Sequence, residues 1–264
     1  MDVRGKRVLI TGASRGIGEA LAREFASQGA TVALVARSAD AIEKLAAETG
    51  GTAHPADLAD PAQVTGLIAR VEEATGPIDV LVNNAGVAPT SGALHDWSQE
   101  DLEQIYRVNL VSPADLCRQV IPGMLQRGRG HIVNVSSLAG VAVFPGLTAY
   151  ASTKAGLTQF TAGLRADLKQ TPIKTTVVEL GPIPTEMLDS VDEYKPTADS
   201  FRRLYRLQLL VDVPKETVAA DVVNAVAHGR RHVRHPKRGN LFPLLTEAPR
   251  RMVEVLLAGV QPRA

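Results

Sequence analysis

The chain has 264 residues, 45% of them hydrophobic and 22% charged, a composition typical of a globular protein and not of a disordered or fibrous one. Its formal net charge of +1 excludes a general electrostatic attraction to nucleic acids or membranes. The single cysteine, Cys117, excludes an intramolecular disulfide, and without a long apolar run or a signal-peptide core we expect a cytoplasmic protein.

Apolar runs rich in β-forming residues alternate with segments of helical periodicity. The predicted strands cover residues 7–11, 31–36, 52–54, 78–83, 131–136, 175–180 and 232–235. One predicted helix begins at Pro61 with Asp60 as its N-cap. Because the strands are apolar on nearly every residue, we expect a parallel sheet with helices on both faces. No linker divides the chain, so we predict one doubly wound α/β domain over residues 1–240 and a helical extension over residues 241–264.

Glycine-rich or polar residues follow four of the predicted strands. They are TGASRGIG at 11–18, NNAG at 83–86, the serine pair at 136–137 and GPIPTEM at 181–187. Doubly wound sheets bind ligands just beyond the carboxyl ends of their strands. We therefore expect these four segments to meet at one site.

The segment 11–18 places three glycines between a strand and a helix. Gly12 suits a tight turn, and Gly16 and Gly18 allow the backbone and the helix to approach closely. The helix that begins near Gly16 offers unpaired N–H groups and a positive dipole end, which suit a pyrophosphate. An ordinary strand-to-helix turn is the alternative, and the other three strand ends make it the weaker interpretation.

The second strand ends without an acidic residue. Folds that bind NAD usually carry Asp or Glu there to hold the ribose 2′-hydroxyl. Here Arg37 stands at that point, and Arg15 lies in the first glycine-rich segment. A guanidinium pairs strongly with a phosphate, so the sequence favours NADP(H) over NAD(H). The alternative is that Arg37 is only a solvated residue at a helix start.

The segment YASTK places Tyr150 and Lys154 on one face of a helix. A free tyrosine has a pKa of about 10 and is a poor base at neutral pH. A neighbouring ammonium stabilises the phenolate, so Lys154, together with the positive charge of an oxidised nicotinamide, is expected to lower the pKa of Tyr150. A Tyr/Lys pair alone is common on helix surfaces, so this interpretation depends on the other segments.

Together, these segments resemble the single-domain branch of the short-chain dehydrogenase/reductase family over about residues 5–230. The resemblance rests on the segments 11–18, 83–86 and 150–154, on Asn109 in VNL and on VNVSS at 133–137, in the family's order and spacing. It implies a Rossmann-like fold and an NADPH-dependent carbonyl reductase or alcohol dehydrogenase. A 3-oxoacyl thioester reductase and a catalytically idle NADP-binding sensor or scaffold are the alternatives.

The resemblance also implies catalytic roles. Tyr150 is expected to be the general acid in reduction and the general base in oxidation, and Lys154 to hold the nicotinamide ribose hydroxyls. Ser137 resembles the serine that binds the substrate oxygen, whereas strand alternation points Ser136 the other way. Asn109 resembles the asparagine that holds a water beside the lysine; the alternative is an ordinary buried asparagine.

The cofactor contacts follow from the same resemblance. Asp57 is similar to the residue that binds the adenine amino group, and residues 83–86 to the segment beside the adenine ribose. Leu180 replaces the usual proline, yet Ile183 and Thr185 are still expected to meet the nicotinamide carboxamide. The expected cofactor-binding residues are Gly12, Ser14, Arg15, Gly16, Ile17, Gly18, Arg37, Asp57, Leu58, Asn84, Ala85, Gly86, Tyr150, Lys154, Gly181, Ile183 and Thr185. No metal is expected, because His228, His232 and His235 lack an accompanying cysteine or acidic set.

A mobile substrate lid is implied over residues 186–212. An apolar inner surface of this lid, opposite Val143, Phe144 and Leu147, favours a hydrophobic carbonyl or alcohol substrate. The apolar lid residues are Met187, Leu188, Phe201, Leu204, Tyr205 and Leu207. The alternative is that these residues only pack the lid onto the body of the protein.

The basic C-terminal segment predicts a further helix from about residue 248. Its apolar stripe favours packing on the core or on another subunit, and contact with an anionic membrane surface is the alternative. Nucleic-acid binding is disfavoured, because the basic run lacks interleaved aromatic residues. The family resemblance implies a homodimer or homotetramer in which the helices near Asn109 and Tyr150 pair across subunits.

Overall fold

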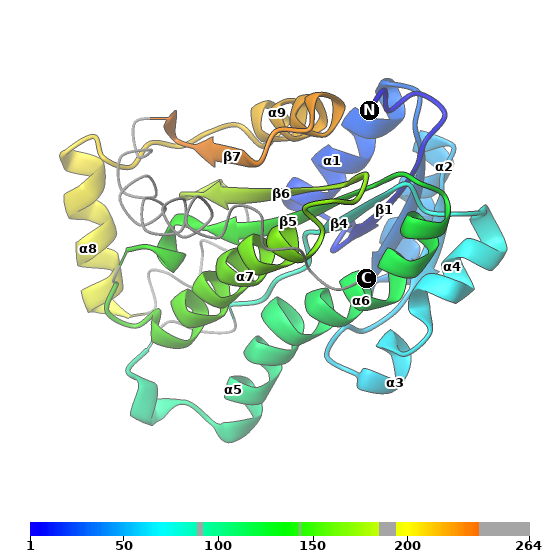
Figure 1. Cartoon of the computed structure of the whole chain (residues 1–264). Helices are drawn as coiled ribbons and strands as arrows, with labels where there is room; N and C mark the ends of the chain where they lie inside the picture. The colour runs from blue at the N-terminus through cyan, green and yellow to red at the C-terminus, as the bar shows by residue number, and fades with distance from the viewer. Residues whose placement is uncertain (89–91, 143, 185–193, 238–264) are drawn as a thin grey trace.

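Figure 1 shows the computed structural model of the chain, in which residues 1–88, 92–142, 144–184 and 194–237 are described. Within these residues, seven strands form one parallel sheet in the order β3-β2-β1-β4-β5-β6-β7. The strands are β1 (Arg7–Thr11), β2 (Thr31–Ala36), β3 (Thr52–Pro55), β4 (Val80–Asn83), β5 (Gly130–Ser137), β6 (Ile173–Leu180) and β7 (His232–His235). The chain moves from β1 to one edge of the sheet and then from β4 to the other, so the strand order reverses between β1 and β4. The predicted doubly wound sheet is confirmed.

Helices cover both faces of the sheet because successive strand residues are buried on opposite sides. Along β1, Val8 and Ile10 belong to one apolar cluster and Leu9 to the other. The first cluster lies under α1 (Gly16–Ser27), α2 (Ala39–Thr49) and α9 (Lys215–His228), and the second under α4 (Leu67–Thr75), α6 (Ser112–Gln126) and α7 (Thr148–Asp167) (Figure 1). The near-continuous apolar strands in the sequence thus reflect burial on two sides.

The helix predicted to begin at Pro61 is two helices, which corrects the sequence prediction. Its start is as expected, because the Asp60 carboxylate accepts a hydrogen bond from the Ala62 N–H (2.8 Å). The first helix, α3 (Pro61–Val64), ends before Gly66, which has a φ of +68° and is the N-cap of α4. The Arg70 guanidinium donates to the Thr65 carbonyl (2.7 Å) and so satisfies backbone that a continuous helix would have used.

A continuous helical segment leads from α5 (Gln99–Tyr106) through a π-helical turn (Arg107–Val111) into α6. Such π-turns are rare and frequently occur at functional sites. This one carries the predicted site residue Asn109. After β6, the described chain resumes with α8 (Lys195–Arg206), which stands at the margin of the molecule (Figure 1).

Several predicted features lie outside the described residues. These are the extension over residues 241–264, the lid residues 186–193, and the individual residues Val143 and Thr185. In the part of the chain that is described, no helix has the length and apolarity that a bilayer crossing requires.

Candidate active site

Side-chain hydrogen bonds join the carboxyl ends of β1 and β4 where the strand order reverses. The Thr11 hydroxyl accepts hydrogen bonds from the Asn84 N–H (3.1 Å) and the Ala85 N–H (3.0 Å). The Asn84 side-chain amide donates to the carbonyls of Thr11 (2.9 Å) and Gly12 (3.1 Å). Asn84 and Ala85, two of the predicted cofactor residues, therefore hold the two loops together. Thr11 was not predicted to take part, although a polar residue ending an apolar strand is a usable signal.

The glycines of segment 11–18 are required for two different structural reasons. Gly12 and Gly16 have φ values of +64° and +60°, which side-chain-bearing residues rarely adopt. A Cβ on Gly18 would overlap the Gly12 carbonyl oxygen and lie 2.6 Å from the Asn84 side-chain nitrogen. The loop is therefore drawn tightly against α1, and Ser14 and Ile17 lie partly buried in the same turn.

The N-terminus of α1 opens at this edge of the sheet. Arg15 precedes the helix with an extended backbone, and its side chain makes no capping hydrogen bond. Arg15 and Arg37 are both exposed, and Arg37 directly follows β2, the neighbour of β1. A positive helix end and two guanidinium groups therefore lie at the carboxyl ends of adjacent strands, an arrangement that suits a phosphate-bearing ligand.

The segment after β3 adds a carboxylate and a structural anchor. The Asp57 carboxylate accepts a hydrogen bond from the Ala59 N–H (2.9 Å). Leu58 is buried, and its carbonyl accepts a hydrogen bond from the Ser112 hydroxyl (2.7 Å) at the start of α6. Of these two predicted cofactor residues, Leu58 fixes the segment to the core, and Asp57 stands partly exposed beside it.

Ser137, Tyr150 and Lys154 come together at the junction of β5 and α7. The Lys154 ammonium lies 5.8 Å from the centre of the Tyr150 ring and donates to the Val135 carbonyl (3.0 Å). The Ser137 hydroxyl donates to the Leu180 carbonyl (3.1 Å) and lies beside the Tyr150 phenol, whose pKa it lowers. A phenol, an ammonium and a hydroxyl therefore share one small volume.

Burial dominates the ionisation of this group. It raises the pKa of Tyr150 above its ordinary value of 10, and the hydrogen bond with Ser137 opposes the rise. Burial also lowers the pKa of Lys154 to about 8. The groups of the chain alone therefore do not produce the expected lowering of the pKa of Tyr150. Burial destabilises the phenolate by more free energy than the neighbouring groups contribute to stabilising it.

Asn109 is fully buried, and the chain itself uses its side-chain amide. Its oxygen accepts a hydrogen bond from the Val87 N–H (2.8 Å), and its nitrogen donates to the Val87 carbonyl (2.9 Å) and to the Thr153 hydroxyl (3.2 Å). The Thr153 hydroxyl in turn donates to the Tyr150 carbonyl (2.7 Å). A Cβ on Gly86 would lie 3.2 Å from the Lys154 nitrogen and 3.4 Å from the Asn109 side-chain oxygen. Thr153, which the sequence did not single out, thus connects Asn109 to Tyr150.

Replacing Thr153 by valine is expected to lower the free energy of unfolding by about 1–3 kcal/mol, because it leaves a buried Asn109 donor without its acceptor. Thr153→Ser keeps the hydroxyl and is the matched control, expected to lie close to the wild type. Urea denaturation followed by circular dichroism measures both. Equal stability of the valine and serine variants would show that the hydroxyl contributes nothing.

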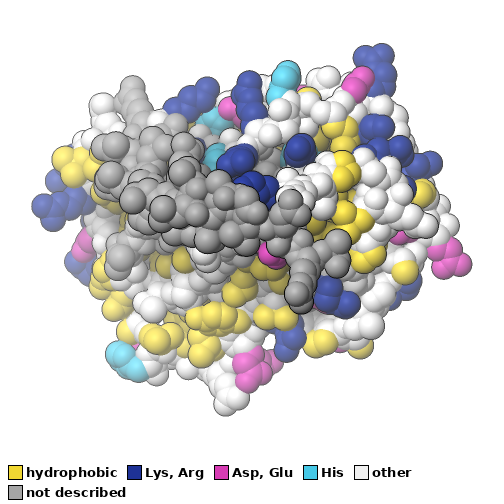
Figure 2. Space-filling view, in the orientation of Figure 1, with side chains coloured by type: hydrophobic (Ala, Val, Ile, Leu, Met, Phe, Trp, Pro, Cys, Tyr) yellow, Lys and Arg dark blue, Asp and Glu magenta, His cyan; other side chains and the backbone are white. Residues whose placement is uncertain are grey.

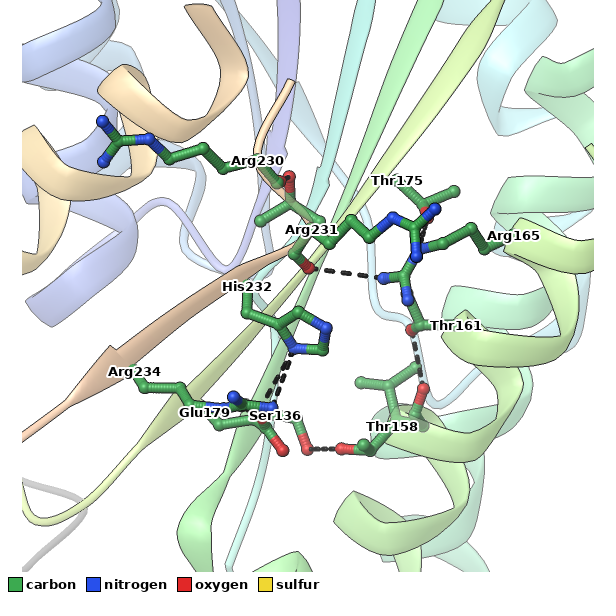
Figure 3. Close-up of polar contacts among 12 residues, drawn as sticks. Ser136, Thr158, Thr161, Arg165, Thr175, Glu179, Arg230, Arg231, His232 and Arg234 are labelled. Atoms are coloured by element: carbon green, nitrogen blue, oxygen red, sulfur yellow. Dashed lines mark hydrogen bonds and ion pairs between the residues drawn. The ribbon is translucent and has the colours of Figure 1, made fainter. Parts of the chain in front are cut away.

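Ser136 and Ser137 have different partners, as strand alternation predicts. The Ser136 hydroxyl donates to the Lys154 carbonyl (2.8 Å) and is hydrogen-bonded to the Thr158 hydroxyl (2.8 Å; Figure 3), and so fixes β5 to α7. Figure 3 also shows Glu179 of β6 beside Arg234 and His232 of β7. Burial raises the pKa of the Glu179 carboxyl, but the hydrogen bonds and charges of His232 and Arg234 outweigh burial, and the pKa is lowered.

Each of the three histidines considered as metal ligands has a partner of its own. His232 Nδ1 lies 3.6 Å from the Glu179 carboxylate, and His235 Nε2 lies 2.8 Å from the Asp221 carboxylate. His228 is hydrogen-bonded to the Asn224 carbonyl (2.9 Å). No cluster of three or more His, Cys, Asp or Glu residues suited to a metal ion occurs within the described ranges.

The segment after β6 is held by β5 and β7. Leu180, which replaces the usual proline, is the last residue of β6. Its carbonyl accepts the hydrogen bond from the Ser137 hydroxyl. The Gly181 N–H donates to the His235 carbonyl (2.7 Å), and a Cβ on Gly181 would lie 2.9 Å from the Pro236 ring. Ile183 is buried.

The described part of the predicted lid, residues 194–212, contains α8, which packs on the loop before α7. The rings of Phe144 and Phe201 are 5.1 Å apart, and the Thr197 hydroxyl donates to the Pro145 carbonyl (2.7 Å). Leu207, expected on the inner surface of the lid, is 59% exposed. It follows the last residue of α8, Arg206, and so leaves the packed face of that helix.

Comparisons with known proteins agree on one group. The model of the short chain dehydrogenase family matches residues 6–196. Oxidoreductase UcpA of Salmonella typhimurium is 42% identical over 193 residues, covering 71% of this chain and 73% of that protein. Ketoacyl reductase HetN of Nostoc sp. is 37% identical over 179 residues, covering 66% of this chain and 62% of that protein. The crystal structure of a metagenomic short-chain oxidoreductase in complex with NADP is 31% identical, covers 89% of this chain and 98% of its own, and has a TM-score of 0.72.

Proposed function

This chain belongs to the short-chain dehydrogenase family, and from that premise we propose that it is an NADP(H)-dependent oxidoreductase acting on a hydrophobic carbonyl compound or the corresponding secondary alcohol. The observation that carries the proposal is the convergence of Ser137, Tyr150 and Lys154 at the carboxyl edge of the sheet. The family uses nicotinamide cofactors and small-molecule substrates, and the glycine-rich edge of the sheet supports the same assignment here.

The chain's own residues fit a dinucleotide. The tight Gly12 turn and the N-terminus of α1 would hold the pyrophosphate, and Asp57 would meet the adenine. Lys154 would hold the nicotinamide ribose, and Ile183 and Thr185 the carboxamide, although Thr185 lies outside the described residues. When bound, the cofactor would supply the hydride.

Tyr150 would give a proton to the substrate oxygen in reduction and take it back in oxidation, while Ser137 donates a second hydrogen bond to that oxygen. The position of Ser137 beside the Tyr150 phenol supports this pairing. Lys154 would stabilise the phenolate after proton transfer, and Asn109 would hold the helix turn and a water beside the lysine.

The preference for NADP(H) rests on the end of β2. A carboxylate there would repel a 2′-phosphate, whereas Arg37 is a solvent-exposed guanidinium with Arg15 on the neighbouring loop. The NADP bound in the similar metagenomic oxidoreductase supports the same choice.

Arg37→Asp is expected to lower kcat/KM for NADPH at least about tenfold and to improve the ratio of NADH to NADPH use, because an attractive charge becomes a repulsive one. Steady-state rates with both cofactors measure this. Lys44→Asp, an exposed charge reversal on α2, is the control and should leave the ratio unchanged. An unaltered cofactor ratio in the Arg37 variant would remove the assignment.

The test of the whole proposal is NADPH oxidation across ketones and aldehydes of graded chain length. We expect kcat/KM to rise with chain length, because the loop before α7 carries the apolar side chains of Phe144 and Leu147, and Phe201 of α8 packs against it. The named activity of the Nostoc relative favours a 3-oxoacyl thioester as the second candidate, which would appear as turnover that needs a thioester-linked chain. Absence of turnover with every carbonyl compound, despite NADPH binding, would favour the idle sensor or scaffold.

The proposal extends to the whole chain. Residues 1–240 would form the catalytic domain in a cytoplasmic homodimer or homotetramer, since the family typically forms oligomers. The exposed residues Tyr106 and Val111 lie along α5 and the π-turn, and the Tyr106 hydroxyl is hydrogen-bonded to Ser152 of α7 (2.6 Å). These helices are therefore the surface we assign to subunit contact.

A further inference from the structure

The outer face of α8 carries a continuous basic stripe. Lys195, Arg202, Arg203 and Arg206 lie at positions i, i+7, i+8 and i+11, which share one face of a helix. The opposite side is packed inward, with Thr197 and Ala198 buried. One acidic residue, Asp199, falls on the basic face, so four cations and one anion leave it a charge of +3.

Within the described residues, the two arginines at the end of this stripe are not neutralised. Asp199 pairs with Lys195 and Arg202, both at 2.8 Å. Arg203 and Arg206 have no ion-pair partner among the described residues, and both side chains are exposed. Two guanidinium groups on one helix turn, without an acidic partner in the part of the chain that is described, give it a local positive field that the overall charge of +1 conceals.

Two exposed leucines continue the stripe beyond the helix. Leu207 is 59% exposed and Leu209 is 43% exposed. Between them, Gln208 has a φ of +54°, so the chain turns sharply at this point. Figure 2 shows apolar and basic side chains next to each other at the margin where α8 lies in Figure 1.

We propose that the α8 stripe, defined as Lys195, Arg202, Arg203, Arg206, Leu207 and Leu209, is a contact surface for an anionic lipid bilayer. Basic side chains at a bilayer surface are attracted to anionic headgroups, and neighbouring leucines can enter the layer below them. The stripe lies on a helix at the molecular margin, a shape that suits a broad deformable surface (Figure 1). A nucleic acid would use the guanidinium groups but offers nothing to the two leucines, so the bilayer accounts for more of the surface.

The contact has a consequence for the site. The Thr197 hydroxyl and the Phe201 ring join α8 to Pro145 and Phe144, which directly precede the helix that carries Tyr150. A bilayer on the outer face of α8 would be separated by this one helix from the loop that we assign to the substrate side. This consequence rests on the proposed function, whereas the binding itself does not.

Co-sedimentation of the full chain with vesicles tests the proposal without cofactor or turnover. Vesicles of phosphatidylcholine alone are compared with vesicles of phosphatidylcholine and phosphatidylserine, at low and at high salt. We expect at least tenfold stronger partitioning onto the anionic vesicles at low salt, and loss of most of it at high salt.

Three variants separate the stripe from general surface charge. Arg203→Gln with Arg206→Gln is expected to weaken partitioning at least fivefold, and Leu207→Ser with Leu209→Ser severalfold. Lys44→Gln with Lys169→Gln removes the same charge from exposed residues elsewhere and should change it less than twofold. Equal partitioning of the wild type onto both vesicle types would overturn the proposal, as would matching losses in the two charge variants. Thermal unfolding of each variant checks that the protein as a whole is still folded.

Discussion

Replacement of Tyr150 by phenylalanine is expected to lower kcat at least about a hundredfold while NADPH binding stays nearly unchanged. General acid–base catalysis by one positioned group contributes about 10²–10⁴-fold. The phenol hydroxyl is the only part removed, so the ring still packs on α7 at 5.8 Å from the Lys154 ammonium. The measurement is steady-state turnover of a carbonyl substrate, with cofactor binding followed separately by nicotinamide fluorescence.

The matched control for this experiment is Tyr106→Phe. Tyr106 also carries a hydrogen-bonded hydroxyl, bound to Ser152 at 2.6 Å, but it lies on the surface of α5 that we assign to subunit contact. Turnover by this variant should stay within about twofold of the wild type, since its hydroxyl takes no part in the chemistry that we assign to Tyr150. Undiminished turnover by Tyr150→Phe would contradict the proposed mechanism and favour another proton donor.

Gly18→Ala is expected to lower the free energy of unfolding by about 3 kcal/mol, because a single added methyl group has no room. The new carbon would overlap the Gly12 carbonyl oxygen and press on the Asn84 amide, so either the loop or α1 must move. Loop movement should also weaken NADPH binding more than tenfold. Urea denaturation and a cofactor titration measure the two effects.

Gly163→Ala provides the matched comparison. Gly163 lies exposed within α7, and a Cβ there meets nothing within 4 Å. The same added methyl group should therefore stabilise the protein by about 0.5–1 kcal/mol, through the lower backbone entropy of alanine in the unfolded chain. If both glycine variants changed stability alike, close packing of the loop on α1 would not explain Gly18.

The sequence could predict the sheet and the position of the site because both depend on local patterns. Strand limits such as Arg7–Thr11 and Thr31–Ala36 follow from apolar runs bounded by turn residues. The glycines of segment 11–18 signal a backbone that other residues cannot adopt, and the spacing of Tyr150 and Lys154 fixes their common helix face. Parallel strands then bring their carboxyl ends to one edge without further information.

Contacts between distant segments could not be predicted in this way. Nothing local to Thr153 indicates that its hydroxyl receives a hydrogen bond from Asn109, which lies 44 residues earlier in the chain. The Ser112 hydroxyl likewise donates to the Leu58 carbonyl, 54 residues earlier. In both cases a side chain binds a group that only folding brings within reach.

By itself, then, the sequence determined the doubly wound sheet, the glycine turn at its carboxyl edge and the pairing of a phenol with an ammonium, because each follows from residue spacing and backbone freedom. Only the tertiary structure decided the direction of the pKa of Tyr150 and the outward exposure of Leu207. The physical reason is that the loss of water around a group depends on every residue packed against it. Those residues come from distant parts of the chain, so a short stretch of sequence does not reveal them.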